Sequence, residues 1–271
     1  MNYMKNKIIL YNNDCLSILP NFDDKSINLI LTDLPYGKLA NKTRAKWDNT
    51  FNYTKLFEEY RRLIKPNGAI ILFGNEPFSS YVRCNLLDIY KYDIKWVKGK
   101  TTGFANANYR PMNKYEDIMI CSYANASSGG KKNPMTYNPQ GLKPVYKKKK
   151  NHINRQGLVS YDTNNLGEDN MLNQETEYIQ KYTNYPTNVV FFNNPKKYLH
   201  PTQKPVPLLE YLIKTYSNPN DLALDTCMGS GSTGVACQNT GRRFIGIELD
   251  EKYYNIAKDR LKEYNSQTRL I

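Results

Sequence analysis

A carboxylic acid followed by Leu-Pro-Tyr stands directly after an apolar run near the start of the chain. The four residues are Asp33, Leu34, Pro35 and Tyr36. A carboxylate and a neighbouring carbonyl oxygen can accept hydrogen bonds from the amino group of a nucleobase, and an aromatic ring can stack on a base that has left its helix. Proline restricts the preceding residue to extended geometry, which sets the direction of the Leu34 carbonyl. The tetrad therefore predicts chemistry on an exocyclic amine.

The reaction that suits such a site is direct methyl transfer. The lone pair of a base amine is delocalised into the ring, which makes the nitrogen a poor nucleophile. Hydrogen bonds accepted by Asp33 and by the Leu34 carbonyl would shift the nitrogen toward tetrahedral geometry. In-line attack on a methylsulfonium then needs no covalent enzyme intermediate, and the sequence has no cysteine beside a proline to serve as a nucleophile.

A second segment has the pattern of a nucleoside site. A predicted strand, 222–225, ends in an acid and turns through glycines into a helix. Glycines let the backbone approach a ligand closely, and the start of a helix offers unpaired amide donors. The predicted binding residues here are Asp225, Gly229, Gly231, Ser232 and Thr233.

The ligand of this loop is predicted to be a nucleoside that carries a positive charge. Glu248 ends the next predicted strand, followed by Leu249, and a carboxylate there can hold both ribose hydroxyls, as in dinucleotide sites. The glycine spacing is neither G-x-G-x-x-G nor a phosphate-binding loop, which disfavours ATP hydrolysis. Asp225 would repel a pyrophosphate but suits S-adenosylmethionine. The alternative is a glycine turn that binds no ligand.

Strands and helices alternate at both ends of the chain. The predicted strands are 8–11, 27–32, 69–73, 94–97, 118–121, 222–225 and 244–248, and regular structure is expected to resume at 189–192. The predicted helices are 53–64, one from Pro205 to Tyr216, one entered from the loop 229–234, and one capped by Asp250. Pro66-Asn67-Gly68 is predicted to separate a helix from the next strand. This order predicts an α/β fold with an open, mostly parallel, doubly wound sheet.

The middle of the chain differs in composition. Residues 131–155 contain seven lysines and one arginine without an acid, and prolines 134, 139 and 144 argue against a regular element there. We therefore predict a catalytic domain, 1–124 with 189–271, and a partly mobile inserted lobe, 125–188. The consecutive lysines Lys147, Lys148, Lys149 and Lys150 are predicted to bind DNA phosphates; a solvated charge run is the alternative.

Composition points to a polyanionic partner. The 271 residues carry a net charge of +13, which favours nucleic acid, although a merely solubilising surface remains the alternative. No apolar run approaches the ~18 residues that span a bilayer, and the short run after Met1 does not resemble a signal peptide, so a cytoplasmic location is predicted. The five cysteines form no C-x-x-C pair and both histidines lack nearby partners, so no metal site is predicted.

The tetrad resembles the D-P-P-Y motif of the amino-group DNA methyltransferases. The segment 225–231 resembles the cofactor loop of that family, 200–205 (His-Pro-Thr-Gln-Lys-Pro) resembles its segment before that loop, and 13–16 resembles its N-terminal Gly-Asp-Cys-like segment. The order of these motifs is that of the circularly permuted β-class. Leu34 in place of the first proline and Asn13 in place of glycine depart from the family pattern.

The resemblance implies a Rossmann-like methyltransferase fold with an inserted recognition lobe and S-adenosylmethionine as the cofactor. It implies that Asp14 contacts the cofactor adenine, that Cys15 also belongs to the cofactor site, and that Thr202 and Lys204 close over the methionine part of the cofactor. Arg110 belongs to a segment near the base pocket and is predicted to bind DNA. From the residues alone, Asp14 could instead cap a helix, and Lys204 could be a solvated charge.

The function that the resemblance implies is site-specific methylation of adenine N6 in DNA. The initial acid of the tetrad favours adenine, because cytosine-N4 members of the family more often begin with serine. Cytosine-N4 methylation, a catalytically silent DNA-binding protein of the same fold and a nicotinamide-dependent oxidoreductase remain alternatives; the last lacks the glycine spacing. DNA, a cognate restriction endonuclease and a second copy of the chain are the expected partners, and no membrane or metal is expected.

Overall fold

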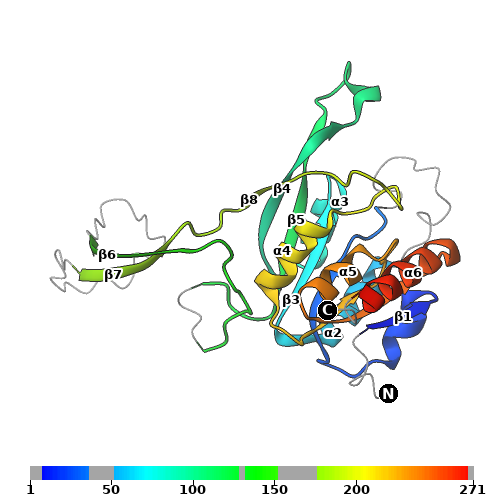
Figure 1. Ribbon diagram of the computed structural model, residues 1–271, viewed down its shortest axis with the longest axis horizontal. Helices are drawn as coiled ribbons and strands as arrows, with labels where there is room; N and C mark the ends of the chain where they lie inside the picture. Colours follow the sequence, from blue (N-terminus) through cyan, green and yellow to red (C-terminus); the bar gives the residue numbers. More distant parts are fainter. Residues whose placement is uncertain (1–7, 37–51, 128–131, 152–175, 268–271) are drawn as a thin grey trace, which may run out of the picture. The chain divides into compact units, whose positions relative to one another are not determined.

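The computed structural model describes residues 8–36, 52–127, 132–151 and 176–267 (Figure 1). The chain forms two compact units. The larger unit joins Met1–Asn138 to Thr187–Ile271, and the smaller one is Pro139–Pro186. In the described residues, no helix is both long enough and apolar enough to pass through a membrane.

The larger unit holds one eight-stranded sheet and its helices. Its strands are β1 (Ile8–Asn12), β2 (Ile27–Thr32), β3 (Ile64–Gly74), β4 (Tyr90–Thr102), β5 (Asn113–Cys121), β8 (Val189–Phe192), β9 (Leu222–Asp225) and β10 (Arg243–Glu248). Its helices are α1 (Cys15–Ile18), α2 (Tyr53–Leu63), α3 (Phe78–Asn85), α4 (Val206–Tyr216), α5 (Ser232–Asn239) and α6 (Glu251–Gln267), with the short 3-10 turns η1 (Leu19–Asn21) and η4 (Phe104–Asn106).

The sheet confirms the predicted topology. Its strand order is β1-β10-β9-β2-β3-β5-β4-β8, and within it only β5 runs antiparallel to its neighbours. Parallel strands need crossovers, and the helices supply them. The carboxyl ends of β1, β10, β9, β2 and β3 therefore meet at one edge, where open sheets of this kind bind ligands.

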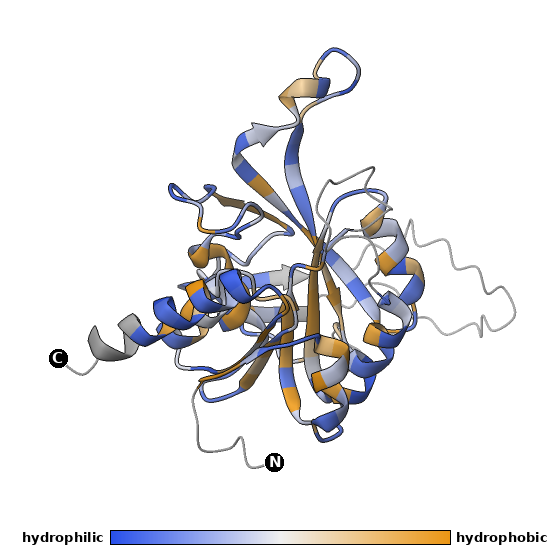
Figure 2. Ribbon diagram, turned by 90° about the vertical axis from the view of Figure 1, so that its right-hand side faces the viewer, coloured by the Kyte–Doolittle hydropathy of each residue, from blue (hydrophilic) through white to orange (hydrophobic). Residues whose placement is uncertain are grey.

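Helices cover both faces of the sheet, which explains why the strands are almost continuously apolar. Along β3, Ile70 and Leu72 pack with α1, α2 and α3, whereas Ile71 and Phe73 pack with α4, α5 and α6. Figure 2 shows the hydrophobic residues concentrated in these strands and hydrophilic residues along much of the helix that leads to the C-terminus. The core is thus two apolar layers, one on each side of the sheet.

The helix α2 ends before Pro66-Asn67-Gly68, as predicted, but β3 begins directly at Ile64, so 66–68 belong to the strand and do not separate it from the helix. Ile64 pairs with Ile27, and a side chain on Gly68 would place its Cβ 2.6 Å from the Asn28 carbonyl oxygen. Glycine is therefore needed at position 68 for the close approach of two strands. The Pro-Asn-Gly sequence thus lies within β3, at the place where this strand closely approaches β2. Strands β4 and β5 are also longer than predicted and continue into a hairpin that projects beyond the helices (Figure 1).

The smaller unit contains a regular element that the prolines had argued against. Strands β6 (Lys143–Asn151) and β7 (Thr176–Thr183) form a two-stranded antiparallel sheet. Pro144 is the second residue of β6, and the register shifts directly after it. Proline is tolerated there because both strands of a two-stranded sheet are edges with free hydrogen-bonding positions.

The compact smaller unit, Pro139–Pro186, spans fewer residues than the inserted lobe predicted at 125–188. Met135 is buried in the core of the larger unit, and the Thr136 amide donates to the Asn67 carbonyl. The Asn138 side chain donates to carbonyls at the end of α4. Residues 132–138 therefore pack with the sheet, while parts of the expected lobe, 128–131 and 152–175, lie outside the described residues.

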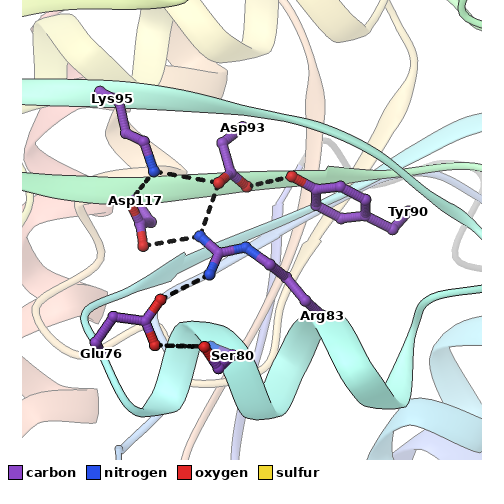
Figure 3. A network of polar contacts seen from close by, with 7 residues as sticks. All are labelled: Glu76, Ser80, Arg83, Tyr90, Asp93, Lys95 and Asp117. Carbon is purple, nitrogen blue, oxygen red and sulfur yellow. Dashed lines mark hydrogen bonds and ion pairs between the residues drawn. The ribbon is translucent and has the colours of Figure 1, made fainter.

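A network of charged side chains fastens α3 to β4 and β5 (Figure 3). Arg83 donates to Glu76 at 2.8 Å, to Asp93 at 2.7 Å and to Asp117 at 2.9 Å. Lys95 also donates to Asp93 and Asp117. The Asp117 side chain is only 5% exposed, so its charge depends on these two cations for compensation.

We expect Arg83→Met to lower the free energy of unfolding by about 2 kcal/mol, because it leaves a buried carboxylate with one cationic partner in place of two. Urea unfolding followed by circular dichroism measures this change. As a control, Arg61→Met breaks a pair with the exposed Asp88 and should cost under about 1 kcal/mol. Equal losses in the two variants would contradict the role given to the network.

Candidate active site

A cavity of about 760 Å³ opens at the carboxyl edge of the sheet in the larger unit. It brings together predicted site residues from both ends of the chain. Those that line it are Asp14, Cys15, Asp33, Leu34, Pro35, Tyr36, Thr202, Lys204, Asp225, Gly229, Ser232, Thr233, Glu248 and Leu249. Among the predicted cofactor residues, Gly231 is not part of this lining.

The tetrad begins directly after β2. The Asp33 carboxylate accepts a hydrogen bond from the Tyr36 hydroxyl at 3.2 Å and another from Lys204 Nζ at 2.5 Å. The Leu34 side chain is buried in the core, and the Tyr53 hydroxyl donates to the Pro35 carbonyl. The backbone of the tetrad is thus held by packing and by a hydrogen bond, which compensates for leucine in place of the usual proline.

The ring of Tyr36 is fixed as a platform. It stacks on Phe78 with the ring centroids 4.9 Å apart and the planes at 25°. Burial, with the charge of Asp33, raises the pKa of Tyr36 well above its usual range, so its hydroxyl is a neutral donor. One face of the ring is covered by Phe78, and the residue borders the cavity.

Two acids and two lysines form a row of alternating charge beside the tetrad. Lys204 contacts Asp33 and lies 3.6 Å from Glu116, and Lys98 donates to Glu116 at 3.0 Å. Asn75 also donates to Glu116, at 3.2 Å. The sequence did not single out Lys98, Glu116 or Asn75 as functional, because Lys98 and Glu116 lie just outside the predicted strands 94–97 and 118–121 and belong to no motif.

The charges in this row stabilise one another. Burial raises the pKa of the Asp33 carboxyl, and the Lys204 cation opposes that shift. Burial works against a charge on Lys204, yet Asp33 and Glu116 together raise its pKa. Burial likewise disfavours the Glu116 charge, but Lys204 and Lys98 hold its pKa below the usual value. Lys204 is therefore an ionised, buried residue, which excludes the alternative of a solvated charge.

The cofactor loop follows β9. The Asp225 carboxylate accepts hydrogen bonds from the Thr233 hydroxyl at 2.6 Å and from the Cys227 amide at 3.1 Å. Burial raises the pKa of Asp225 to about 6, so it is a carboxylate above that pH. Gly231 has a φ of +76°, and a Cβ on it would lie 2.9 Å from that of Ala257. Gly231 thus serves the close packing of α6.

Glu248 is oriented by two backbone amides at the end of β10. Its carboxylate accepts from the Gly229 amide at 2.8 Å and from the Asp250 amide at 2.9 Å. Both bonds fix the side chain at the wall of the cavity. Leu249 follows and is exposed at its rim.

Asp14 and Cys15 follow β1 and lie beside the end of β10, where the Asn13 amide donates to the Glu248 carbonyl at 3.1 Å. The Asp14 side chain caps α1 by accepting from the Leu16 amide at 2.9 Å, and the residue also lines the cavity. Capping and ligand contact are therefore compatible. Burial raises the pKa of the Cys15 thiol to about 12 and that of Cys227 well above its usual range. Neither thiol is a ready nucleophile, in agreement with transfer without a covalent intermediate.

The segment 200–205 closes one side of the cavity and leads into α4. The Thr202 hydroxyl lies 3.1 Å from His200 Nδ1, and the His200 ring packs edge-on against Tyr253 at 4.2 Å between centroids. Burial, followed by the Lys204 charge, lowers the pKa of His200, which keeps this imidazole neutral. No cluster of three potential metal ligands is found in the parts of the chain that the structure describes.

The predicted DNA-binding residues lie outside the cavity. Arg110 is exposed in the loop between β4 and β5. Lys147, Lys148 and Lys149 are exposed on β6, and Lys148 pairs with Glu177 of β7 at 2.5 Å. Lys150 also belongs to β6, but its side chain lies outside the described residues.

Residues 27–259 match the family model described as "DNA methylase". The chain belongs to this family. The match spans the tetrad, the row of charges, the segment 200–205 and the cofactor loop, which confirms the family predicted from the four motifs. These enzymes take their methyl group from S-adenosylmethionine.

Curated relatives and solved structures agree with this assignment. The chain is 28% identical over 270 residues to the type II methyltransferase M.HpaI of Haemophilus parainfluenzae, covering 93% of this chain and 74% of that one. It is 28% identical over 263 residues to the DNA adenine methyltransferase YhdJ of Escherichia coli strain K12, covering 92% and 80%. The crystal structure of the M1.HpyAVI–SAM complex is similar with a TM-score of 0.58 and 28% identity, covering 94% of this chain and 100% of that chain.

We expect Asp225→Asn to stabilise the protein without cofactor by roughly 1–2 kcal/mol at pH 8, because the buried carboxylate costs free energy there. The raised pKa means that the folded protein holds this proton up to about pH 6, while the unfolded chain releases it near ~4. The difference should therefore grow as the pH rises from about 4 to about 6 and stay constant above. Urea unfolding at several pH values measures it, with the exposed Asp259→Asn as control.

The same variant should bind S-adenosylmethionine at least about tenfold more weakly at pH 8, since a carboxylate that faces a cationic ligand is lost. Titration calorimetry measures this affinity. Tighter or unchanged binding in Asp225→Asn would contradict the role of Asp225 at the cofactor site.

Proposed function

We propose that this protein transfers a methyl group from S-adenosylmethionine to N6 of adenine at specific sites in DNA. One observation carries the proposal: the tetrad for amine chemistry and the cofactor loop, far apart in sequence, line the same cavity. A base amine bound at Asp33 and a methyl donor bound at Asp225 would thus meet. Membership of the DNA methylase family supports the reaction class.

The residues of the cavity fit the cofactor. Its ribose hydroxyls suit the Glu248 carboxylate, whose direction is already fixed by the Gly229 and Asp250 amides. The negative charges of Asp225 and Glu248 suit a ligand with a sulfonium, and Asp14 lies at the wall where the adenine would bind. The bound cofactor supplies an electrophilic methyl group.

The tetrad acts on the target amine. Asp33 and the Leu34 carbonyl accept its two N–H bonds, which directs the nitrogen lone pair toward the methyl group. Tyr36 stacks on the extruded base with the ring face that Phe78 leaves open. Transfer of the methyl group from the bound cofactor would leave the target nitrogen with a proton to lose. Asp33, whose pKa is raised by burial, is placed to accept that proton.

Adenine is favoured over cytosine as the target. The relative YhdJ is named a DNA adenine methyltransferase and aligns over 92% of this chain. The tetrad begins with an acid, as expected for adenine members. Cytosine-N4 methylation would use the same residues, and the assay below distinguishes the two products.

Two exposed segments are proposed to contact DNA. In the larger unit, the loop between β4 and β5 presents Phe104, Tyr109 and Arg110, and the two aromatic residues are 81% and 90% exposed. In the smaller unit, β6 presents Lys147, Lys148 and Lys149, a set of charges that suits phosphates. We propose that the inserted smaller unit, Pro139–Pro186, serves target recognition.

The remaining proposals concern partners and location. A cognate restriction endonuclease is proposed because the relative M.HpaI is a type II methyltransferase. A homodimer is proposed from the family resemblance, and light scattering of the purified chain tests it. A cytoplasmic location is proposed because the substrate is DNA.

The wild-type protein should form N6-methyladenine in unmethylated genomic DNA supplied with labelled S-adenosylmethionine. Asp33→Ala should lower the rate at least about 100-fold, because the target amine loses its charged acceptor. Digestion to nucleosides with mass analysis measures the product, and the exposed Asp259→Ala is the control. N4-methylcytosine would correct the base, and absence of any methylated nucleoside would favour the silent DNA-binding alternative.

Replacing Lys147, Lys148, Lys149 and Lys150 by glutamine should weaken binding to all DNA sequences alike. Each lost phosphate contact lowers the slope of log affinity against log salt by about 0.9, and Lys148 should contribute less because it pairs with Glu177. Fluorescence anisotropy over a range of salt concentrations measures the slope. Lys258→Gln with Lys262→Gln on α6 is the control, and an unchanged slope in the β6 variant would disprove the contact.

A further inference from the structure

Lys204 lies between two buried carboxylates of the catalytic cavity. Its Nζ is 2.5 Å from Asp33 Oδ2 and 3.6 Å from Glu116 Oε2. The side chains of Lys204 and Glu116 are 8% and 9% exposed, so this cation is largely shielded from water. Nζ also lies 5.0 Å from the centre of the Phe73 ring, which gives it an apolar wall beside both acids.

The carboxylate of Glu116 has one oxygen atom that accepts no hydrogen bond from the described residues. Glu116 Oε1 accepts hydrogen bonds from Lys98 and Asn75, whereas Glu116 Oε2 is buried and has no hydrogen-bond partner among the described residues. A buried carboxylate oxygen without a donor is costly and normally finds one. A small movement of Nζ would complete a bond to Oε2.

The contact with Asp33 conflicts with the reaction. Asp33 must accept a hydrogen bond from the target amine, yet one of its oxygens is bound to Lys204 and the other to the Tyr36 hydroxyl. An ammonium at 2.5 Å competes directly with an incoming neutral amine for the same oxygen. A carboxylate oxygen can accept more than one hydrogen bond, but the bond from the amine reaches full strength only when the ammonium releases this oxygen. A buried cation that leaves one anion needs another anion to move to.

We propose that Lys204 moves from Asp33 to Glu116 when the target base enters, so that Glu116 is a positioning residue which frees Asp33 for the amine. In the resting protein, Lys204 neutralises Asp33 and holds the acceptor in place. In the complex with the base, the lysine forms its bond with Glu116 Oε2 and remains ionised. This inference rests on the proposed function, because it assumes that an amine binds at Asp33.

The surroundings keep Glu116 suitable for this task. Lys98 at 3.0 Å favours its charged form, and this lysine is itself buried beside the Trp96 ring at 5.5 Å. Other charged or titratable groups near the row are Tyr36, Asp225 and Asp117, of which Asp117 is engaged by Arg83 and Lys95. The Lys98–Glu116 pair therefore provides a fixed anion toward which Lys204 can swing.

The test compares two DNA duplexes that differ only in the target amine. One carries adenine at the site that the wild-type protein methylates, and the other carries purine, which lacks the 6-amino group. Affinities are measured by anisotropy with S-adenosylhomocysteine present, so that no transfer occurs. Glu116→Gln should weaken binding of the adenine duplex about tenfold and leave the purine duplex within about twofold, because only the amine displaces Lys204.

Two controls separate this role from a structural one. Glu58→Gln, an exposed change on α2, should alter neither affinity. In a Lys204→Met background, adding Glu116→Gln should leave the ratio of the two affinities unchanged, because no lysine then competes for Asp33. With the adenine duplex and S-adenosylmethionine at saturation, Glu116→Gln alone should slow single-turnover methyl transfer about tenfold.

The outcomes are distinct. Equal weakening of both duplexes by Glu116→Gln, no weakening of either, or an effect of the same size in the Lys204→Met background would each overturn the inference while the proposed function stands. Absence of methyl transfer by the wild-type protein would overturn the proposed function, and this inference with it.

Discussion

The ion pair between Lys204 and Asp33 joins residues 171 positions apart in the sequence and binds the cofactor half of the cavity to its catalytic half. A carboxylate at the end of a buried strand is costly unless a cation and hydrogen bonds offset its lost hydration. Lys204 provides that cation from the segment that leads into α4. The course of the chain before α4, the closure of the cavity and the charged state of Asp33 therefore all involve this contact.

Much of the fold follows from local pattern. The strands β2 and β9 have the predicted bounds, and the helices α2 and α4 agree closely, because apolar periodicity and capping are local properties. The start of β3 was placed too late, after the Pro-Asn-Gly stretch, because the close approach of Gly68 to the neighbouring strand is a contact that no local rule detects. The prediction that prolines would prevent a regular element at β6 was wrong for a similar reason, since pairing with the distant strand β7 outweighed the composition of the segment.

The site was only partly predictable for the same reason. Residues that belong to contiguous motifs, such as Asp33 and Asp225, could be selected from their neighbours in the sequence. Lys98 and Glu116 could not be selected in this way, because their role depends on contacts that form only in the folded protein. Strands β4 and β5 bring them together, and Glu116 then lies near Lys204. Gly231 had the right spacing for a ligand loop, yet its contact is with Ala257 of α6. Spacing alone does not distinguish a glycine that approaches a ligand from one that approaches a helix.

The way in which residues 139–186 leave and rejoin the larger unit has an evolutionary consequence. Just before the departure, the Asn138 amide and side chain are bonded to carbonyls at the end of α4; just after the return, the Asn188 carbonyl accepts from the Lys95 amide of β4. Both junctions are thus anchored by backbone groups whose bonding does not depend on the inserted sequence. If this unit serves target recognition as proposed, a lineage could exchange the insertion for another and acquire a new specificity while the residues of the cavity are inherited intact.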